Sequence, residues 1–119
     1  MEFRFENLEI WKEARVFVND VYVASSNFPR DEMFGMVSQL RRASLSVLLN
    51  ITEGSDRGSD KEFIRFLRMA NTSLQEVIAA YFIALDQKYV TKTEFDEIYQ
   101  KSHILSKKIN ALIRYLNKS

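Results

Sequence analysis

The residues best suited to chemistry are few and scattered. The single histidine, His103, lies in a lysine-rich stretch (101–108), and no acid follows Glu97 to orient or activate its imidazole. A glutamine, Gln100, stands three residues before it, so the Glu-x-x-His pair of di-iron helical bundles is missing. We therefore expect a surface histidine and predict no catalytic residue, no metal, no cofactor and no enzyme activity.

A glycine-containing loop, 54–59, precedes an expected helix start. Backbone N–H groups at such a place can hold a phosphate. This loop lacks the Gly-Lys-Ser/Thr of a P-loop. A turn between two helices is the favoured interpretation.

One line of polar side chains recurs at spacings of three and four, which puts its members on one helix face. It consists of Gln39, Arg42, Ser46, Asn50 and Glu53, and Ser73 and Glu76 can face it from the next helix. We favour a structural network tying Asn50, Glu53, Ser73 and Glu76 together, because buried polar groups need partners. Such a network would fix helix register or hold two subunits. One alternative is a solvated face. The other is a small-molecule or catalytic site that uses Glu53 and Glu76.

Four long stretches without internal proline carry these residues, and we expect helices near 7–27, 30–53, 59–87 and 91–117. Pro29 suits the start of a helix. The segments 59–62 and 91–94 both match the S/T-x-x-E capping box, in which a hydroxyl and a glutamate satisfy free N–H groups. Residues 1–7 are expected to form a short docking arm.

Apolar residues recur at alternating spacings of four and three in each stretch, as on the buried face of a bundle helix. These stripes run from Ile10 to Phe28, Met33 to Ile51, Phe63 to Ala84 and Phe95 to Leu116, interrupted only by Ser44 and Ser102. Short connections then favour antiparallel neighbours. The predicted fold class is all-α, an antiparallel up-down-up-down four-helix bundle.

Composition agrees with one globular domain over residues 1–119, since 46% of the chain is hydrophobic and 28% charged. The absence of cysteine excludes disulfide scaffolds, thiolate zinc sites and cysteine nucleophiles. No apolar run approaches the roughly 20 residues of a membrane span. We expect a cytoplasmic protein with no membrane partner, and the net charge of +1 names no other partner.

The stripes use fewer than half of the apolar residues. We expect part of this surplus to contact other subunits, because large exposed apolar patches mark interfaces. A broad core stripe with ordinary exposed residues is the alternative. The candidate interface residues are Trp11, Val18, Tyr22, Phe34, Leu48 and Phe82.

Basic residues gather on both sides of the glycine loop, and a ring of subunits would repeat them into a positive surface able to bind phosphates. In a single subunit the intervening acids favour a mixed solvated face. The acid-free last helix is a competing basic site. The candidate nucleic-acid-binding residues are Arg41, Arg42, Arg57, Lys61, Arg65 and Arg68.

Ordered short motifs give the sequence a recognisable likeness: Leu8–Lys12, Phe28–Pro29, Glu32–Gly35, Gln39–Ala43, Ser46, Asn50–Ile51, Glu53–Gly54, Glu62–Leu67, Ala70 and Ser73–Glu76. The chain resembles the bacterial four-helix bundle proteins encoded in intervening sequences of 23S ribosomal RNA genes, the S23 family, over about residues 8 to 90. The likeness extends to the accessory variability protein of diversity-generating retroelements. Thr52 and the pair Asn71–Thr72 depart from the family pattern.

The resemblance implies a homopentameric ring, no established catalytic activity and a largely unassigned biological role. It also implies nucleic acid or a nucleic-acid enzyme such as a reverse transcriptase as partners. Our hypothesis from the sequence is a non-enzymatic homo-oligomeric module that binds structured RNA or a ribonucleoprotein. The alternative is a protein-interaction scaffold with no nucleic-acid role.

Overall fold

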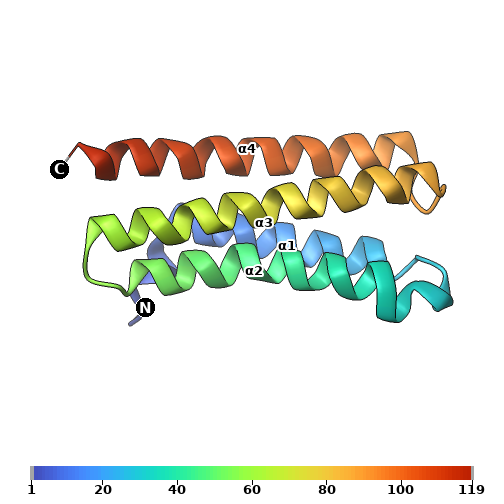
Figure 1. Ribbon diagram of the computed structural model, residues 1–119, viewed down its shortest axis with the longest axis horizontal. Helices are drawn as coiled ribbons and strands as arrows, with labels where there is room; N and C mark the ends of the chain where they lie inside the picture. Colours follow the sequence, from blue (N-terminus) through green and yellow to red (C-terminus); the bar gives the residue numbers. More distant parts are fainter. Residues whose placement is uncertain (1, 119) are drawn as a thin grey trace.

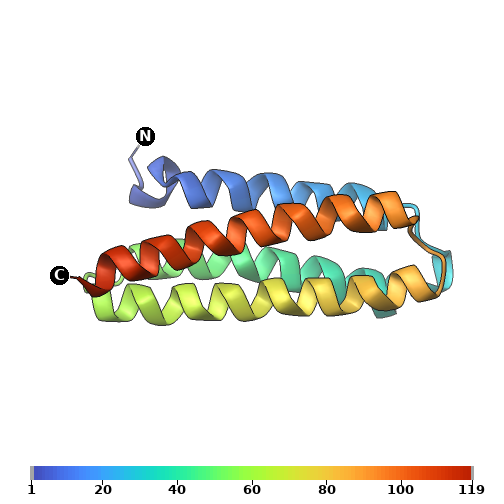
Figure 2. The same cartoon turned by 90° about the horizontal axis from the view of Figure 1, so that it is seen from above.

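A computed structural model describes residues 2–118 and confirms the all-helical prediction, with no strand in that range. The four long helices lie side by side along the 46 Å axis of a body about 46 × 23 × 21 Å, and their connections alternate between its two ends (Figures 1 and 2). They are α1 (Glu9–Ser25), α2 (Ser38–Ser55), α3 (Asp60–Asp86) and α4 (Lys92–Asn117). Three short segments accompany them: η1 (Arg4–Asn7), η2 (Arg30–Glu32) and η3 (Met33–Val37).

The core is built from the predicted stripes. All the α3 stripe residues are buried, and so are the two serines that interrupt the pattern, Ser44 and Ser102. Each of these hydroxyls donates to a carbonyl one helical turn earlier, which satisfies it inside the core. Three stripe positions deviate: Met33 is exposed, while Ser25 and Ile113 replace the half-buried Ala24 and Leu112 in the core.

Both predicted capping sites begin a helix, but they differ. At α4 the box is complete: the Thr91 hydroxyl accepts from the Glu94 N–H, and the Glu94 carboxylate accepts from the Thr91 N–H at 2.8 Å. At α3 the Ser59 hydroxyl accepts from the Glu62 N–H. The Glu62 carboxylate instead accepts two hydrogen bonds from Arg65, so the reciprocal half of the box is lost there.

The stretch before α2 is not the regular helix expected from residue 30. A 3-10 turn, η2, runs into a π-helical turn, η3, before α2 begins at Ser38. Glu32 holds this irregular segment: its carboxylate accepts from the Met36 N–H at 3.3 Å and from the Tyr89 hydroxyl at 2.9 Å. The same side chain therefore ties the start of α2 to the connection between α3 and α4.

α2 and α3 make the most extensive contact of any pair of helices. Gly54, the buried glycine near the end of α2, allows this approach: a Cβ there would lie 2.8 Å from Phe66 Cβ and 2.9 Å from Phe63 Cδ1. The glycine loop is thus a turn between helices, as favoured. Within it, Gly58 adopts a left-handed φ of 79°, which suits a residue without Cβ.

Residues 2–7 form the expected docking arm, while Met1 lies outside the described residues. The Arg4 guanidinium donates to the Ser55 carbonyl at 3.0 Å and lies over the Phe63 ring. The Phe5 ring packs against Trp11 with centroids 4.9 Å apart. The arm covers the end of α2 and the start of α1. Along the described chain, no helix is long and apolar enough to cross a membrane.

Leu74 tests the stripe, because its side chain is 2% exposed in the centre of α3. Leu74→Ala should lower the free energy of unfolding by about 2 to 5 kcal/mol, the range for removing a buried leucine side chain. The neighbouring exposed residue, Gln75, provides the control. Gln75→Ala should change the free energy of unfolding by less than about 0.5 kcal/mol. Urea unfolding followed by circular dichroism measures both. Equal effects of the two changes would contradict the assignment of the core.

Candidate functional site

The six candidate basic residues do not form one group. Arg41 and Arg42 lie near the start of α2, and a rise of about 1.5 Å per residue puts them on the order of 20 Å from Arg57. Arg41 turns toward α1, where it donates to the Ser25 hydroxyl at 3.0 Å and lies over the Tyr22 ring. Arg42 turns toward α3. The expected gathering around one turn is therefore limited to the other four residues.

These four, Arg57, Lys61, Arg65 and Arg68, occupy the α2–α3 turn and the first half of α3, and we call them the basic end. Arg57 and Arg65 both lie over the Phe66 ring, at 4.9 and 4.5 Å from its centroid. Phe66 is only 7% exposed beneath them. An aromatic ring contacted by two guanidinium groups restricts their positions, and the edge of each guanidinium also meets a neighbouring carboxylate.

Acids accompany the basic end. Glu53 pairs with Arg57 at 2.8 Å and Glu62 pairs with Arg65 at 3.1 Å. The hydrogen bond from Arg65 lowers the pKa of Glu62, and the charges of Arg65, Arg57 and Lys61 lower it further. Lys61 and Arg68 form no ion pair within residues 2–118. They are the cations with most freedom to bind an anion.

The last helix brings further positive charge to the same end of the molecule. The end of α4 lies near the α2–α3 turn in both views (Figures 1 and 2). The final turns of α4 contain Arg114, Lys118 follows as the C-cap, and no acid lies among these residues. Only this end of the competing basic site lies near the α2–α3 turn, because Lys101 and Lys108 pair with acids of α1.

The polar line is only partly joined. Asn50 donates to the Ser46 carbonyl and hydroxyl, and the Ser73 hydroxyl donates to the Ser46 hydroxyl at 2.9 Å. Ser46 is thus the centre of a short chain that links α2 to α3. Arg42 and Glu76 form a separate pair across the same helices at 3.6 Å. Gln39 is exposed, near the start of α2.

Glu53 and Glu76 do not face each other. Their arginine partners, Arg57 and Arg42, lie in different parts of the chain, and Arg42 and Glu53 are separated by about 16 Å along α2. Each carboxylate is held by its own arginine at a different level of the bundle, so the two do not form an acid and base pair around one bond. The expected network therefore excludes Glu53, which turns toward the basic end instead.

The candidate interface residues differ in accessibility. Phe34 is 96% exposed on the π-helical turn, and Tyr22 and Phe82 are also exposed. Leu48 is half-buried against the core. Val18 is 7% exposed, so packing within the subunit leaves little of it for another copy. Trp11 is half-buried and donates to the Thr52 hydroxyl at 2.9 Å. Thr52, one of the departures from the family pattern, thus has a hydrogen-bonding role.

His103 is exposed on α4 beside a shallow hollow between α3 and α4, with a volume of about 370 Å³. The other lining residues include Asn71, Tyr99 and Ser106, and none is an acid. Asn71 already accepts from Ser106 and donates to Asn110. Nowhere in the described chain do three or more His, Cys, Asp or Glu side chains form a group able to hold a metal ion.

The seam between α1 and α4 is a feature that the sequence did not predict. Lys101 pairs with Asp20 at 2.7 Å, and Lys108 pairs with Glu13 and Glu9. The hydrogen bond to Glu13 raises the pKa of Lys108, so the ammonium stays charged. The opposite charges of the first and last helices were visible in the sequence as an excess of acids in 1–20 and of bases in 98–119. This difference in charge indicates that the first and last helices pair with each other.

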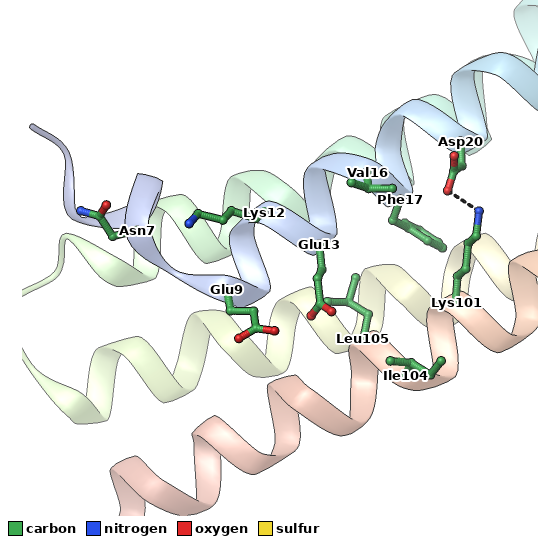
Figure 3. A pocket seen from close by; sticks show the side chains of 10 residues that line it. All are labelled: Asn7, Glu9, Lys12, Glu13, Val16, Phe17, Asp20, Lys101, Ile104 and Leu105. Carbon is green, nitrogen blue, oxygen red and sulfur yellow. Dashed lines mark hydrogen bonds and ion pairs between the residues drawn. The ribbon is translucent and has the colours of Figure 1, made fainter. Parts of the chain in front are cut away.

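A groove of about 680 Å³ lies along this seam (Figure 3). Its apolar floor includes Val16, Phe17, Ile104 and Leu105, and charged side chains border it. The Asp20–Lys101 pair closes one end (Figure 3). The two buried side-chain atoms without a hydrogen-bond partner within residues 2–118 both belong to this seam: Glu13 Oε2 in the groove, and the Tyr81 hydroxyl beyond the pair.

Comparison with known proteins reveals similarities in both sequence and fold. The family model described as 23S rRNA-intervening sequence protein matches residues 6–111. The fold is similar to a crystal structure, at 1.70 Å resolution, of a protein with unknown function from the S23 ribosomal protein family of Bacteroides thetaiotaomicron VPI-5482. That chain is 21% identical, with a TM-score of 0.78, and the match covers 87% of this chain and 97% of that chain. No curated protein gives a significant match.

Because the phenol of Tyr81 is buried, we expect the free energy of unfolding to fall at high pH. Burial raises its pKa from 10.0 to about 12, with help from the charges of Glu94 and Asp20. The unfolded chain therefore loses this proton first as the pH rises. The stability that the neutral phenol contributes is fully present below about pH 10 and is lost as the pH rises through 12, by about 3 kcal/mol in total.

Urea unfolding of the wild-type protein and Tyr81→Phe, between about pH 9 and pH 12, measures this loss. The Phe variant has no phenol at this position, so the wild-type protein should lose stability relative to Tyr81→Phe over that range, by up to about 3 kcal/mol. Lysine deprotonation affects both proteins alike. A constant difference across the range would mean that Tyr81 titrates normally.

Proposed function

The chain belongs to the 23S rRNA-intervening sequence protein family, and from this premise we propose that it is a non-enzymatic, homo-oligomeric module that binds structured RNA or another nucleic acid. Its subunit is an antiparallel up-down-up-down four-helix bundle, and its subunits form a closed ring, most simply of five copies. We also propose that the chain is related to the accessory variability protein of diversity-generating retroelements. A nucleic-acid enzyme or ribonucleoprotein is then a further partner.

The observation that carries the nucleic-acid proposal is the arrangement of the basic end. Arg57 and Arg65 are held over one aromatic ring, Phe66, and Lys61 and Arg68 extend the same positive region without ion-pair partners in the described chain. Ordered guanidinium groups suit phosphate, because their planar forks bind two oxygens at once. Ring symmetry would repeat this region around the assembly. Contacts with phosphates alone bring little sequence preference.

Self-association is supported by the large apolar side chains that a bundle only 21 Å thick leaves uncovered. Phe34 and Tyr115 are 96% and 72% exposed. Single exposed apolar residues are ordinary, but an almost fully exposed phenylalanine fixed on a hydrogen-bonded π-helical turn is typical of an interface anchor. Phe34 therefore has the strongest claim to a subunit contact.

A scaffold without a nucleic-acid role is the second candidate. It is favoured by the ion pairs of Arg57 and Arg65 with Glu53 and Glu62, which partly neutralise the basic end before any ligand binds. The absence of enzyme activity remains a proposal, supported by the separation of Glu53 from Glu76 and by the acid-free surroundings of His103.

Salt dependence tests nucleic-acid binding. Each phosphate contact lowers log K by about 0.7 to 0.9 per decade of salt, so Lys61→Gln with Arg68→Gln should flatten the slope by about 1.4 to 1.8. These two residues are chosen because their removal leaves no acid unpaired. Fluorescence anisotropy with structured RNA and duplex DNA across a salt series measures the slope.

The matched control removes the same charge from exposed positions away from the α2–α3 turn, with Lys88→Gln and Lys107→Gln. It should leave the slope unchanged. A slope flattened only by this control would move the site away from the basic end. Absence of binding by the intact protein at about 50 mM salt, where electrostatic binding is strong, would leave the scaffold as the function.

Oligomer formation is tested by light scattering, which should give a mass several times the 14.0 kDa of one chain. Phe34→Ser should shift the mass toward the monomer while the helix content stays the same, because Phe34 is 96% exposed in a single subunit. Val23→Ser, also at an exposed position, is the control and should keep the wild-type mass. A wild-type mass of one chain at micromolar concentration would refute the assembly.

A further inference from the structure

A second hollow lies on the α1–α4 seam, beyond the Asp20–Lys101 pair and near the start of α4. Its volume is about 260 Å³. Apolar residues including Val23, Val90 and Ile98 line part of it. The polar groups around it are Asp20, Asn27, Tyr81, Glu94, Glu97 and Lys101. Neither the basic end nor the subunit contact proposed above uses this hollow.

The Tyr81 hydroxyl is the unusual group here. Tyr81 is 1% exposed, and its hydroxyl has no hydrogen-bond partner within residues 2–118. A buried hydroxyl without a partner destabilises a protein, so such groups are rare and normally meet a water or a ligand. Tyr81 belongs to α3, yet it lines this hollow together with residues of α1 and α4, so the far end of its side chain reaches across the core to the hollow. Burial raises the pKa of the phenol most, and the charges of Glu94 and Asp20, which also line the hollow, raise it further.

The surrounding charge selects the sign of a ligand. Asp20, Glu94 and Glu97 face one cation, Lys101, which is paired with Asp20. One Glu94 oxygen accepts the Thr91 N–H in the capping box, which fixes the position of that carboxylate. Glu97 forms no ion pair within the described residues. The hollow therefore carries an excess of negative charge beside a hydroxyl able to accept a hydrogen bond.

The spacing of the acids selects the type of cation. No three acidic or imidazole side chains in residues 2–118 are close enough to hold a metal ion. An organic cation has no such requirement, because its methylene groups can cover Val23, Val90 and Ile98 while its ammonium groups reach separate carboxylates. An ammonium group offers three donors, which suits a carboxylate and a phenol oxygen together.

We propose that this hollow is a binding site for a small aliphatic amine of the diamine class. One ammonium group donates to the Tyr81 hydroxyl and the Glu94 carboxylate, and the second is attracted to Glu97. The methylene chain packs on the apolar side of the hollow. Asp20 and Lys101 form its border with the larger groove (Figure 3).

Isothermal titration of the full chain with putrescine, at constant ionic strength, tests the site. Saturable binding is expected, and butanediol, which has the same length without charge, should give none. Tyr81→Phe should weaken binding by about 10-fold or more, the effect of losing a hydrogen bond to a charged group. Glu97→Gln should weaken it as well. Glu94→Gln should also weaken it while keeping the helix start, since glutamine serves in a capping box.

Asp56→Asn is the matched control, because it removes one exposed carboxylate from the α2–α3 turn at the opposite end of the bundle. Its affinity should equal that of the wild type. Tyr81→Phe removes only an unpartnered hydroxyl, so an unchanged circular dichroism spectrum verifies its fold. No saturable heat above a sodium chloride titration, or equal affinity of Tyr81→Phe and wild type, would overturn the proposal and assign the hydroxyl to a water.

Discussion

The close approach of α2 and α3 is the contact on which the other parts of the bundle depend. It requires a residue without a side chain at Gly54, where the rings of Phe63 and Phe66 leave no room for a Cβ. Farther along the same pair, the small side chains of Ser46 and Ser73 meet at 2.9 Å. Because these residues set how near the two helices come, they also set the position of the turn between them and of the cations on it.

The basic end follows from this packing. Phe66 lies where α3 leaves the turn, and its outer face is covered by Arg57 and Arg65 rather than by another helix. The aromatic ring thus serves the core on one side and orders two guanidinium groups on the other. Residues 53–68 carry four bases and four acids, so the phosphate binding that we propose would depend on this fixed geometry and on its repetition by symmetry rather than on net charge.

The α1–α4 seam is packed less closely than the α2–α3 contact. These two helices close the bundle with less contact than the other adjacent pairs, and ion pairs from Lys101 and Lys108 span the gap. Long charged side chains hold helices together without filling the space between them. Hollows and unpartnered buried atoms, Glu13 Oε2 and the Tyr81 hydroxyl, therefore gather at this seam.

The sequence by itself determined the four helices, most of the core and the starts of α3 and α4, because periodic burial and capping are local properties of the chain. Even the buried Ser44 and Ser102 were marked by their place in the stripe. Local signals were insufficient where side chains from distant segments compete. Glu62 left its capping box for Arg65, and Glu32 held a π-helical turn by meeting Tyr89 from another connection. Tertiary structure alone decided that Arg41 turns toward α1, that Glu53 leaves the polar network, and that Tyr81 lacks a partner, because each depends on which side chains meet across the helices.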